Sequence, residues 1–380
     1  MTSSTSRAAA PASRTAVSST RLADGRELLY FDDGTTPQQR RTEDTRGLPP
    51  RGPSGEVRFD ALTGEWVAVA AHRQHRTHLP PADECPLCPS TPGRPSEIPA
   101  PDYDVVVFEN RFPSLGPDLA AAPVAPGWGT RGTAGGRCEV VAFTPDHTGA
   151  FAKLGTRRVR TVIDAWAHRT EALSALPGVQ QVFCFENRGQ DIGVTLHHPH
   201  GQIYAYPYLT PRAAVMARAA EAFLAATGQT LTGHILAGER ADGSRMLVEG
   251  EHFSAYVPFA ARWPLEIHLV PHRQVPDLAA LNGAERDELA VIYPDLLGRL
   301  DGLYGTPTPY ISAWHQAPVD PALRRSGYLQ LQITSPRRAA DKLKFLAGSE
   351  AAMGAFINDT TPEQVAAALR ATAAGRTGTP

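Results

Sequence analysis

The chain has 380 residues, 42% of them hydrophobic, and a formal net charge of −2 at pH 7. This length suits one large or two medium domains. The balanced charge argues against a protein that binds nucleic acid or a membrane surface through bulk charge. No segment approaches the roughly 18 apolar residues of a membrane span, and the N-terminus lacks the apolar core of a secretory signal. The sequence therefore predicts a soluble cytoplasmic protein with no nucleic-acid or membrane partner.

The predicted secondary structure begins after a polar N-terminal segment. Residues 1–54 contain little to bury and are predicted to be largely flexible, apart from a short strand at 27–31, so ordered structure is expected from about Val57. Helical spacing of apolar residues predicts a helix over 155–175, and proline at its start supports a second helix over 211–227. Runs rich in Val and Phe predict strands at 65–71, 103–109, 138–144 and 179–186.

The second half of the chain repeats the plan of the first. Residues 139–154 (EVVAFTPDHTGAFAKL) align with 266–281 (EIHLVPHRQVPDLAAL), because both contain a strand, a turn with proline and an apolar entry to a helix. Three further pairs correspond in the same order: 155–175 with 284–303, 179–186 with 310–314, and the strand at His200 with 328–334. Self-similarity at this period indicates a duplicated domain rather than a solenoid. We therefore predict an α+β architecture and not a doubly wound sheet.

The run LHHPHGQ holds three imidazoles and an amide, which a core strand does not need. Pro199 fixes one backbone angle and biases His198 toward an extended conformation. Residues two apart in an extended segment face the same way, so we expect His198, His200 and Gln202 to project from one surface. Gly201 is expected to let a ligand approach the backbone. Metal ligation or a polar strand face is the alternative interpretation of this run.

The HPHGQ run at 198–202 resembles the signature of the galactose-1-phosphate uridylyltransferases, a branch of the histidine-triad superfamily. The resemblance extends from about Val57 to Leu369. It implies two histidine-triad-like halves, at 55–227 and 228–380, that form a duplicated antiparallel-sheet architecture with flanking helices. It also implies a homodimer that transfers a uridylyl group from UDP-glucose to galactose 1-phosphate, giving UDP-galactose and glucose 1-phosphate.

The resemblance gives His200 and Gln202 their roles. A neutral imidazole of His200 can attack an α-phosphorus and leave a covalent uridylyl-histidine, which divides the reaction into two ping-pong steps. Gln202 can donate its amide to a non-bridging phosphoryl oxygen, where charge builds up in the transition state. The second acceptor is a phosphate that is already ionised at neutral pH, so this step requires no general base.

The four cysteines are too scattered for a secreted disulfide scaffold. Cys85 and Cys88 form a CxxC pair, which can supply two thiolates to a tetrahedral zinc site. A redox pair or two buried thiols are the alternatives, although the prolines of this run do not suggest the helix that a redox pair usually opens. The resemblance implies His147 and His198 as the remaining ligands of a closed structural zinc site.

The resemblance also implies contacts with the substrates. The residues at the matching positions are Arg73, Arg76, Asn110, Asn187, Thr195, Lys344 and Glu350. Planar guanidinium groups suit phosphate oxygens. Arg111 stands where the family often has Asp. Gln330 and Gln332 stand where some members have histidine ligands of a second metal, and amides are poor ligands beside imidazoles, so the second site is predicted to be lost.

Two other functions stay open at this point. The first is a nucleotide-sugar or dinucleoside-polyphosphate phosphorylase of the same superfamily, in which inorganic phosphate accepts the nucleotide. The second is a non-catalytic, zinc-stapled nucleotide-binding protein. The intact pair of His200 and Gln202 counts against the second function, because binding alone needs no nucleophile.

Overall fold

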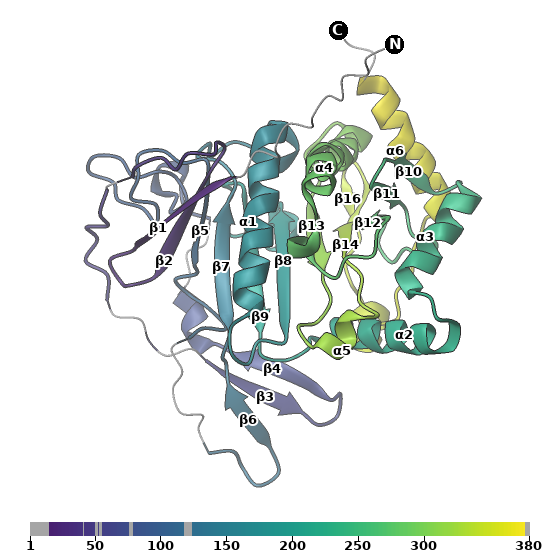
Figure 1. The fold of residues 1–380 in the computed structure, drawn as a ribbon, viewed down its shortest axis with the longest axis horizontal. Helices are drawn as coiled ribbons and strands as arrows, with labels where there is room; N and C mark the ends of the chain where they lie inside the picture. Colours follow the sequence, from purple (N-terminus) through teal and green to yellow (C-terminus); the bar gives the residue numbers. More distant parts are fainter. Residues whose placement is uncertain are drawn as a thin grey trace, which may run out of the picture.

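A computed structural model describes residues 15–40, 42–49, 52, 55–75, 79–117 and 124–376. Its centre is an 11-stranded sheet in the order β1-β2-β5-β7-β9-β8-β13-β14-β12-β11-β10 (Figure 1). Every neighbouring pair in this sheet is antiparallel. Two smaller sheets have the orders β4-β3-β6 and β15-β16.

The strands are β1 (Ala16–Arg21), β2 (Glu27–Asp32), β3 (Glu56–Asp60), β4 (Glu65–Val69), β5 (Val105–Glu109), β6 (Thr130–Thr133), β7 (Arg137–Ala142), β8 (Gln181–Arg188), β9 (His200–Tyr206), β10 (Met246–Glu249), β11 (Phe253–Tyr256), β12 (Leu265–Pro271), β13 (Tyr310–His315), β14 (Gln330–Ser335), β15 (Arg337–Ala339) and β16 (Lys342–Leu343). The α-helices are α1 (Thr156–Ser174), α2 (Pro211–Thr227), α3 (Leu231–Asp242), α4 (Gly283–Tyr304), α5 (Pro321–Arg324) and α6 (Pro362–Arg376).

The order of the large sheet confirms the predicted duplication. The run β5-β7-β9-β8 on one side mirrors β11-β12-β14-β13 on the other, and β8 pairs with β13 at the centre. The two long helices follow the same correspondence, since α1 precedes β8 and α4 precedes β13. The α+β class and its two related halves are therefore confirmed. The division of the chain between residues 227 and 228 stays a prediction.

Helices α1 and α4 lie side by side across one face of the sheet (Figure 1). Trp166 of α1 stacks on Phe151 with ring centroids 5.9 Å apart, and Phe151 contacts Tyr293 of α4 at 4.6 Å. Full burial of a large apolar side chain contributes about 1.5–3 kcal/mol. Trp166 and Tyr293 also contact Trp314 of β13, with ring centroids 6.4 Å and 6.3 Å away, so this aromatic cluster packs both helices against the sheet.

Local sequence signals explain the start of α4 and both ends of α2. The Asn282 side chain accepts a hydrogen bond from the Glu285 backbone N–H at 3.0 Å, and Glu285 accepts one from the Asn282 N–H at 2.8 Å. This reciprocal capping satisfies the free donors at the start of α4. Helix α2 begins at Pro211, as predicted, and ends before Gly228, whose φ of +71° suits glycine.

The expectation that ordered structure begins near Val57 is wrong. Strands β1 and β2 lie upstream and form a hairpin at one edge of the large sheet, and β2 pairs with β5. Leu28 and Phe31 of β2 are fully buried. The hairpin turns at Gly25, with φ +81°. The prediction failed because β1 (AVSSTR) is polar on its exposed face, which hid its pairing. Residues 1–14 and a few others of the predicted flexible segment lie outside the described residues.

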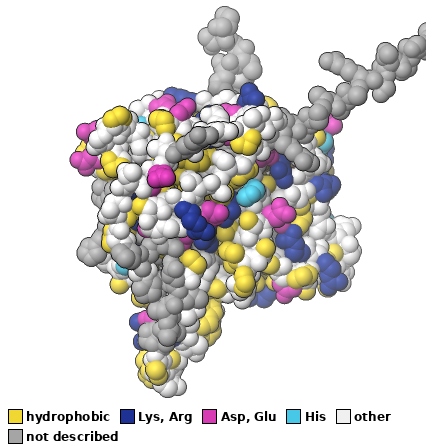
Figure 2. Space-filling model, turned by 60° about the vertical axis from the view of Figure 1, so that its left-hand side comes forward, with side chains coloured by type: hydrophobic (Ala, Val, Ile, Leu, Met, Phe, Trp, Pro, Cys, Tyr) yellow, Lys and Arg dark blue, Asp and Glu magenta, His cyan; other side chains and the backbone are white. Residues whose placement is uncertain are grey.

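The distribution of charged side chains on the surface agrees with the small net charge of the chain. On the face in Figure 2, the described basic and acidic side chains are interspersed with apolar ones, without a broad patch of either sign. None of the helices in the described part of the chain has the length and apolar character needed to cross a membrane.

Candidate active site

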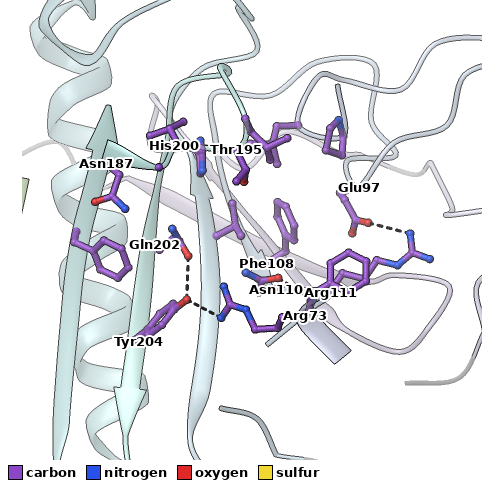
Figure 3. Close-up of a pocket in the computed structure, with 18 residues that line it drawn as sticks. Arg73, Glu97, Phe108, Asn110, Arg111, Asn187, Thr195, His200, Gln202 and Tyr204 are labelled. Carbon is purple, nitrogen blue, oxygen red and sulfur yellow. Dashed lines mark hydrogen bonds and ion pairs between the residues drawn. The ribbon is translucent and has the colours of Figure 1, made fainter. Parts of the chain in front are cut away.

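A cavity of about 300 Å³ lies on the face of the sheet away from α1. Strands β5, β7, β9 and β8 form its floor. Its walls are formed by the loops before β5 and β9, by the segment after β5 and by Arg73 (Figure 3). Six of the residues selected from the sequence line it: Arg73, Asn110, Asn187, Thr195, His200 and Gln202. The fold thus brings together residues that are far apart in the sequence.

Alternation along β9 separates the cavity from the core. Ile203 and Ala205 belong to the hydrophobic core, whereas His200, Gln202 and Tyr204 are half-buried and line the cavity. The expectation that residues two apart share a face is therefore confirmed for His200 and Gln202.

His198 and Gly201 depart from the expectations. The side chain of His198 lies against Cys88 instead of lining the cavity, because β9 begins only at His200. A Cβ on Gly201 would lie 2.8 Å from the Phe143 ring. Glycine is thus required here by packing on the core side, and not by the approach of a ligand.

The tautomer of His200 follows from its hydrogen bond. Its Nδ1 lies 2.7 Å from the His198 backbone carbonyl oxygen, which can only accept, so Nδ1 carries the proton. Burial lowers the pKa of His200 and keeps the ring neutral at pH 7. The lone pair is consequently on Nε2, as a nucleophile requires.

Gln202 belongs to a short chain of hydrogen bonds. The Tyr204 hydroxyl donates to Gln202 Oε1 at 3.2 Å, and Arg73 Nη1 donates to the Tyr204 oxygen at 3.4 Å (Figure 3). With its carbonyl oxygen engaged by Tyr204, Gln202 has its amide NH₂ free to donate to a ligand.

The neighbouring strand β8 presents Asn187 to the cavity and Glu186 to the opposite face. Burial raises the pKa of Glu186 to about 8, so this carboxyl group is mostly protonated at neutral pH. Glu186 therefore belongs to the helix-covered interior, and Asn187 is the member of this pair that can contact a ligand.

The far end of the cavity is charged. Glu97 and Arg111 lie there, opposite His200 and Gln202 (Figure 3), with a carboxylate–guanidinium distance of 4.0 Å. Asn110 accepts a hydrogen bond from the Phe112 N–H at 2.8 Å, which leaves the Asn110 NH₂ as a donor. Because Glu97 is held by Arg26 at 2.6 Å and by Arg46 at 2.9 Å, the cavity offers mainly donors at the end remote from the imidazole.

A second cluster lies beside the cavity. Cys85, Cys88, His147 and His198 each offer one ligand atom, and these atoms all lie within 4.8 Å of one another. Zinc–sulfur and zinc–nitrogen bonds in tetrahedral geometry place S and N about 3.6 Å apart. The Cys88 sulfur lies 3.5 Å from His147 Nδ1 and 3.6 Å from His198 Nδ1. This donor set fits a tetrahedral metal ion.

The orientation of His198 supports the same conclusion. Its Nε2 donates to the Thr144 carbonyl oxygen at 2.7 Å, and Tyr103 donates to the same oxygen at 2.6 Å. The lone pair of His198 is therefore on Nδ1, the nitrogen that faces Cys88. Hydrogen bonds of this kind orient histidine ligands in metal sites.

Two described residues selected from the sequence do not meet the others at the cavity. Lys344 and Glu350 are buried and pair with each other at 2.8 Å, and neither lines the cavity. Arg76 lies outside the described residues.

The region where some family members have a second metal site here holds the cationic side chain of Arg212. Gln330 and Gln332 are buried, and Arg212 of α2 donates to Gln332 Oε1 at 2.7 Å. His315 of β13 lies opposite Gln330, and burial and the nearby Arg212 lower the pKa of His315 to about 3. A guanidinium at this position repels a metal cation.

Among the polar residues that line the cavity, sequence reasoning missed Tyr204 and Glu97. Tyr204 follows Gln202 by two residues, so the same alternation could have identified it. Glu97 carries no such signal, because only the folded loop brings its side chain to the cavity.

Comparisons with known proteins agree across the chain. Residues 53–210 match the model of the galactose-1-phosphate uridyl transferase N-terminal domain, and 217–376 match that of its C-terminal domain. Galactose-1-phosphate uridylyltransferase of Streptomyces lividans is 51% identical over 79% of this chain and 80% of its own length. That of Thermotoga maritima is 36% identical over 83% and 98%. A solved uridylyltransferase structure is 30% identical, with a TM-score of 0.75, over 84% of this chain and 99% of the other.

Proposed function

This chain belongs to the galactose-1-phosphate uridylyltransferase family, a family of nucleotidyltransferases, and we propose that it transfers a uridylyl group from UDP-glucose to galactose 1-phosphate. The products are UDP-galactose and glucose 1-phosphate. The observation that carries this proposal is the neutral His200, whose proton is held on Nδ1 and whose Nε2 is left for a phosphorus atom beside Gln202.

The reaction has two steps. His200 Nε2 attacks the α-phosphorus of UDP-glucose, and the bond from this phosphorus to the bridging oxygen breaks, which releases glucose 1-phosphate. A phosphate oxygen of galactose 1-phosphate then attacks the same phosphorus, and the N–P bond breaks to restore His200. In both steps the Gln202 amide donates to a non-bridging oxygen, where negative charge grows.

The contacts of the substrates are part of the proposal. Asn187 and Thr195 line the cavity near His200, Arg73 lines it beside Tyr204, and all three suit the diphosphate. Asn110 lies further along and suits the uridine, and Arg76 would join Arg73 at the phosphates.

Lys344 and Glu350 are buried and pair with each other outside the cavity, so their contact with the sugar phosphate stays a prediction that rests on the family. A homodimer is a prediction that rests on the family, and a cytoplasmic location is a prediction that rests on the sequence.

We propose zinc as the ion held by Cys85, Cys88, His147 and His198, and the S···N distances support this choice. All four positions of a tetrahedral ion would be filled by side chains, which is the pattern of structural sites. The ion would therefore fix the Cys loop to the segment before β9 and take no part in the reaction.

The test is mass spectrometry of the intact wild-type protein after incubation with UDP-glucose. We expect a mass increase of one uridylyl group, located on His200 by peptide mapping. Discharge of the adduct by galactose 1-phosphate, and not by inorganic phosphate, would separate the transferase from a phosphorylase. The absence of any adduct would contradict the covalent mechanism.

Replacing Gln202 with Ala is expected to slow both steps without preventing the adduct. Loss of one preorganised donor to a developing charge costs about a hundredfold or more in rate. The affinity for UDP-glucose should change only modestly, because the hydrogen bond strengthens mainly in the transition state. Rapid-quench measurement of adduct formation and discharge checks this, and wild-type rates for both would show that Gln202 does not act on the phosphorus.

Metal analysis of the purified protein should find little iron. Gln330 and Gln332 offer amides, and Arg212 places a positive charge against Gln332. Both features disfavour a second transition metal. Stoichiometric iron, measured by inductively coupled plasma mass spectrometry alongside zinc, would contradict this prediction.

A further inference from the structure

We infer that Tyr204 is a positioning residue that fixes the Gln202 amide in the orientation needed for phosphoryl transfer. This inference rests on the proposed function of the same site. It starts from the chain of hydrogen bonds that joins Arg73, Tyr204 and Gln202 at one side of the cavity (Figure 3).

The direction of this chain follows from its first member. A guanidinium group can only donate hydrogen bonds, so the Tyr204 oxygen accepts from Arg73 Nη1 at 3.4 Å. The Tyr204 proton is then directed to Gln202 Oε1 at 3.2 Å. Burial raises the pKa of Tyr204, so the phenol keeps the proton that it donates.

The consequence concerns the two ends of the Gln202 amide. The last torsion of a glutamine side chain is broad and roughly two-fold, so a free amide can turn by half a rotation. In the turned orientation its carbonyl oxygen, instead of its NH₂, would meet a phosphoryl oxygen, and two acceptors repel. Engagement of Oε1 by Tyr204 disfavours that orientation before any substrate arrives.

The ring of Tyr204 is itself held in place. It packs edge-on against Phe185 with centroids 5.2 Å apart, and it lies 5.9 Å from the ring of Tyr206. These contacts do not involve the hydroxyl. Removal of the hydroxyl alone therefore deletes its hydrogen bonds to Gln202 and Arg73 without emptying the site.

The experiment compares Tyr204→Phe with wild type in single-turnover adduct formation from UDP-glucose. We expect the rate to fall by about tenfold, the ratio that corresponds to one lost hydrogen bond. UDP-glucose affinity should stay within about twofold of wild type, because the effect lies in the orientation of a transition-state donor. Tyr206→Phe, on the same strand and face but outside the cavity lining, is the matched control and should keep the wild-type rate.

A double-mutant cycle separates positioning from other roles. In a Gln202→Ala background, Tyr204→Phe should cause no further slowing, since its partner is already gone. Equal slowing in both backgrounds, or a wild-type rate in Tyr204→Phe, would overturn the inference. Failure of the wild-type protein to form any adduct would instead contradict the proposed function, so the two failures are distinguishable.

Discussion

Replacing His200 with Ala is expected to eliminate the uridylyl adduct and to lower sugar exchange by about 10⁶-fold, the order of loss seen when an enzyme is deprived of its nucleophile. The fold should survive. His200 is half-buried, and its side chain makes one described hydrogen bond, to the His198 carbonyl, which contributes about 1 kcal/mol. Activity assays, intact-mass analysis and a thermal melt of the same preparation check the prediction.

His197 provides the matched control. It is exposed, directly precedes His198 and does not line the cavity. His197→Ala should therefore form the adduct at the wild-type rate. Sugar exchange at the wild-type rate in folded His200→Ala protein would show that the reaction does not pass through this imidazole.

Much of the fold could be predicted because repetition and apolar patterning are local properties of a sequence. The helix over 155–175 and the strand over 179–186 correspond to α1 and β8, and their counterparts correspond to α4 and β13. The pairing of β8 with β13, which joins the halves into one sheet, could not be predicted, because it depends on which strand edges meet in the folded chain.

The N-terminal hairpin shows a signal that was overlooked. Asp24-Gly25 between two strand-like runs is a turn pair typical of hairpins, and in the structure Gly25 has the positive φ that such turns require. The polar composition of β1 outweighed this signal. An edge strand needs to bury only part of its surface, so composition alone is a poor guide there.

Some residues of the candidate site could be placed from the sequence, and others could not. His200 and Gln202 could be placed together because strand alternation is a rule of the backbone. Alternation could not place His198, since β9 begins only at His200, and the resemblance alone pointed to its position beside Cys88. Tyr204 obeys the same alternation, but an aromatic residue in a strand is most often core, and only the distances to Gln202 and Arg73 give it a role.

One residue connects the metal cluster to the nucleophile. The His198 side chain offers Nδ1 to the cluster, and its backbone carbonyl accepts the proton of His200 Nδ1. A shift of His198 would therefore disturb the hydrogen bond that selects the His200 tautomer. We expect metal loss to reduce activity through this backbone contact, although the ion itself has no place in the reaction.

Removal of Cys85 tests this connection. Wild-type protein should hold about one zinc per chain, and Cys85→Ala should lose most of it. A structural zinc contributes roughly 10 kcal/mol or more of apparent binding free energy in small domains. Only part of this stabilises the large sheet of this chain, so we expect the free energy of unfolding to fall by about 3 kcal/mol or more. The rate of adduct formation should fall in parallel with zinc content across partly loaded preparations.

Cys138 is the control for loss of a buried thiol. It is fully buried in β7 and is not a member of the four-residue metal cluster. Cys138→Ala should retain its zinc and lose only about 1 kcal/mol of stability, the usual cost of a small deletion in a core. Normal zinc content after replacement of both Cys85 and Cys88 would contradict the assignment of the cluster. Full activity in a zinc-free but folded Cys85→Ala protein would leave the zinc assignment intact and show that His198 keeps its backbone position without the ion.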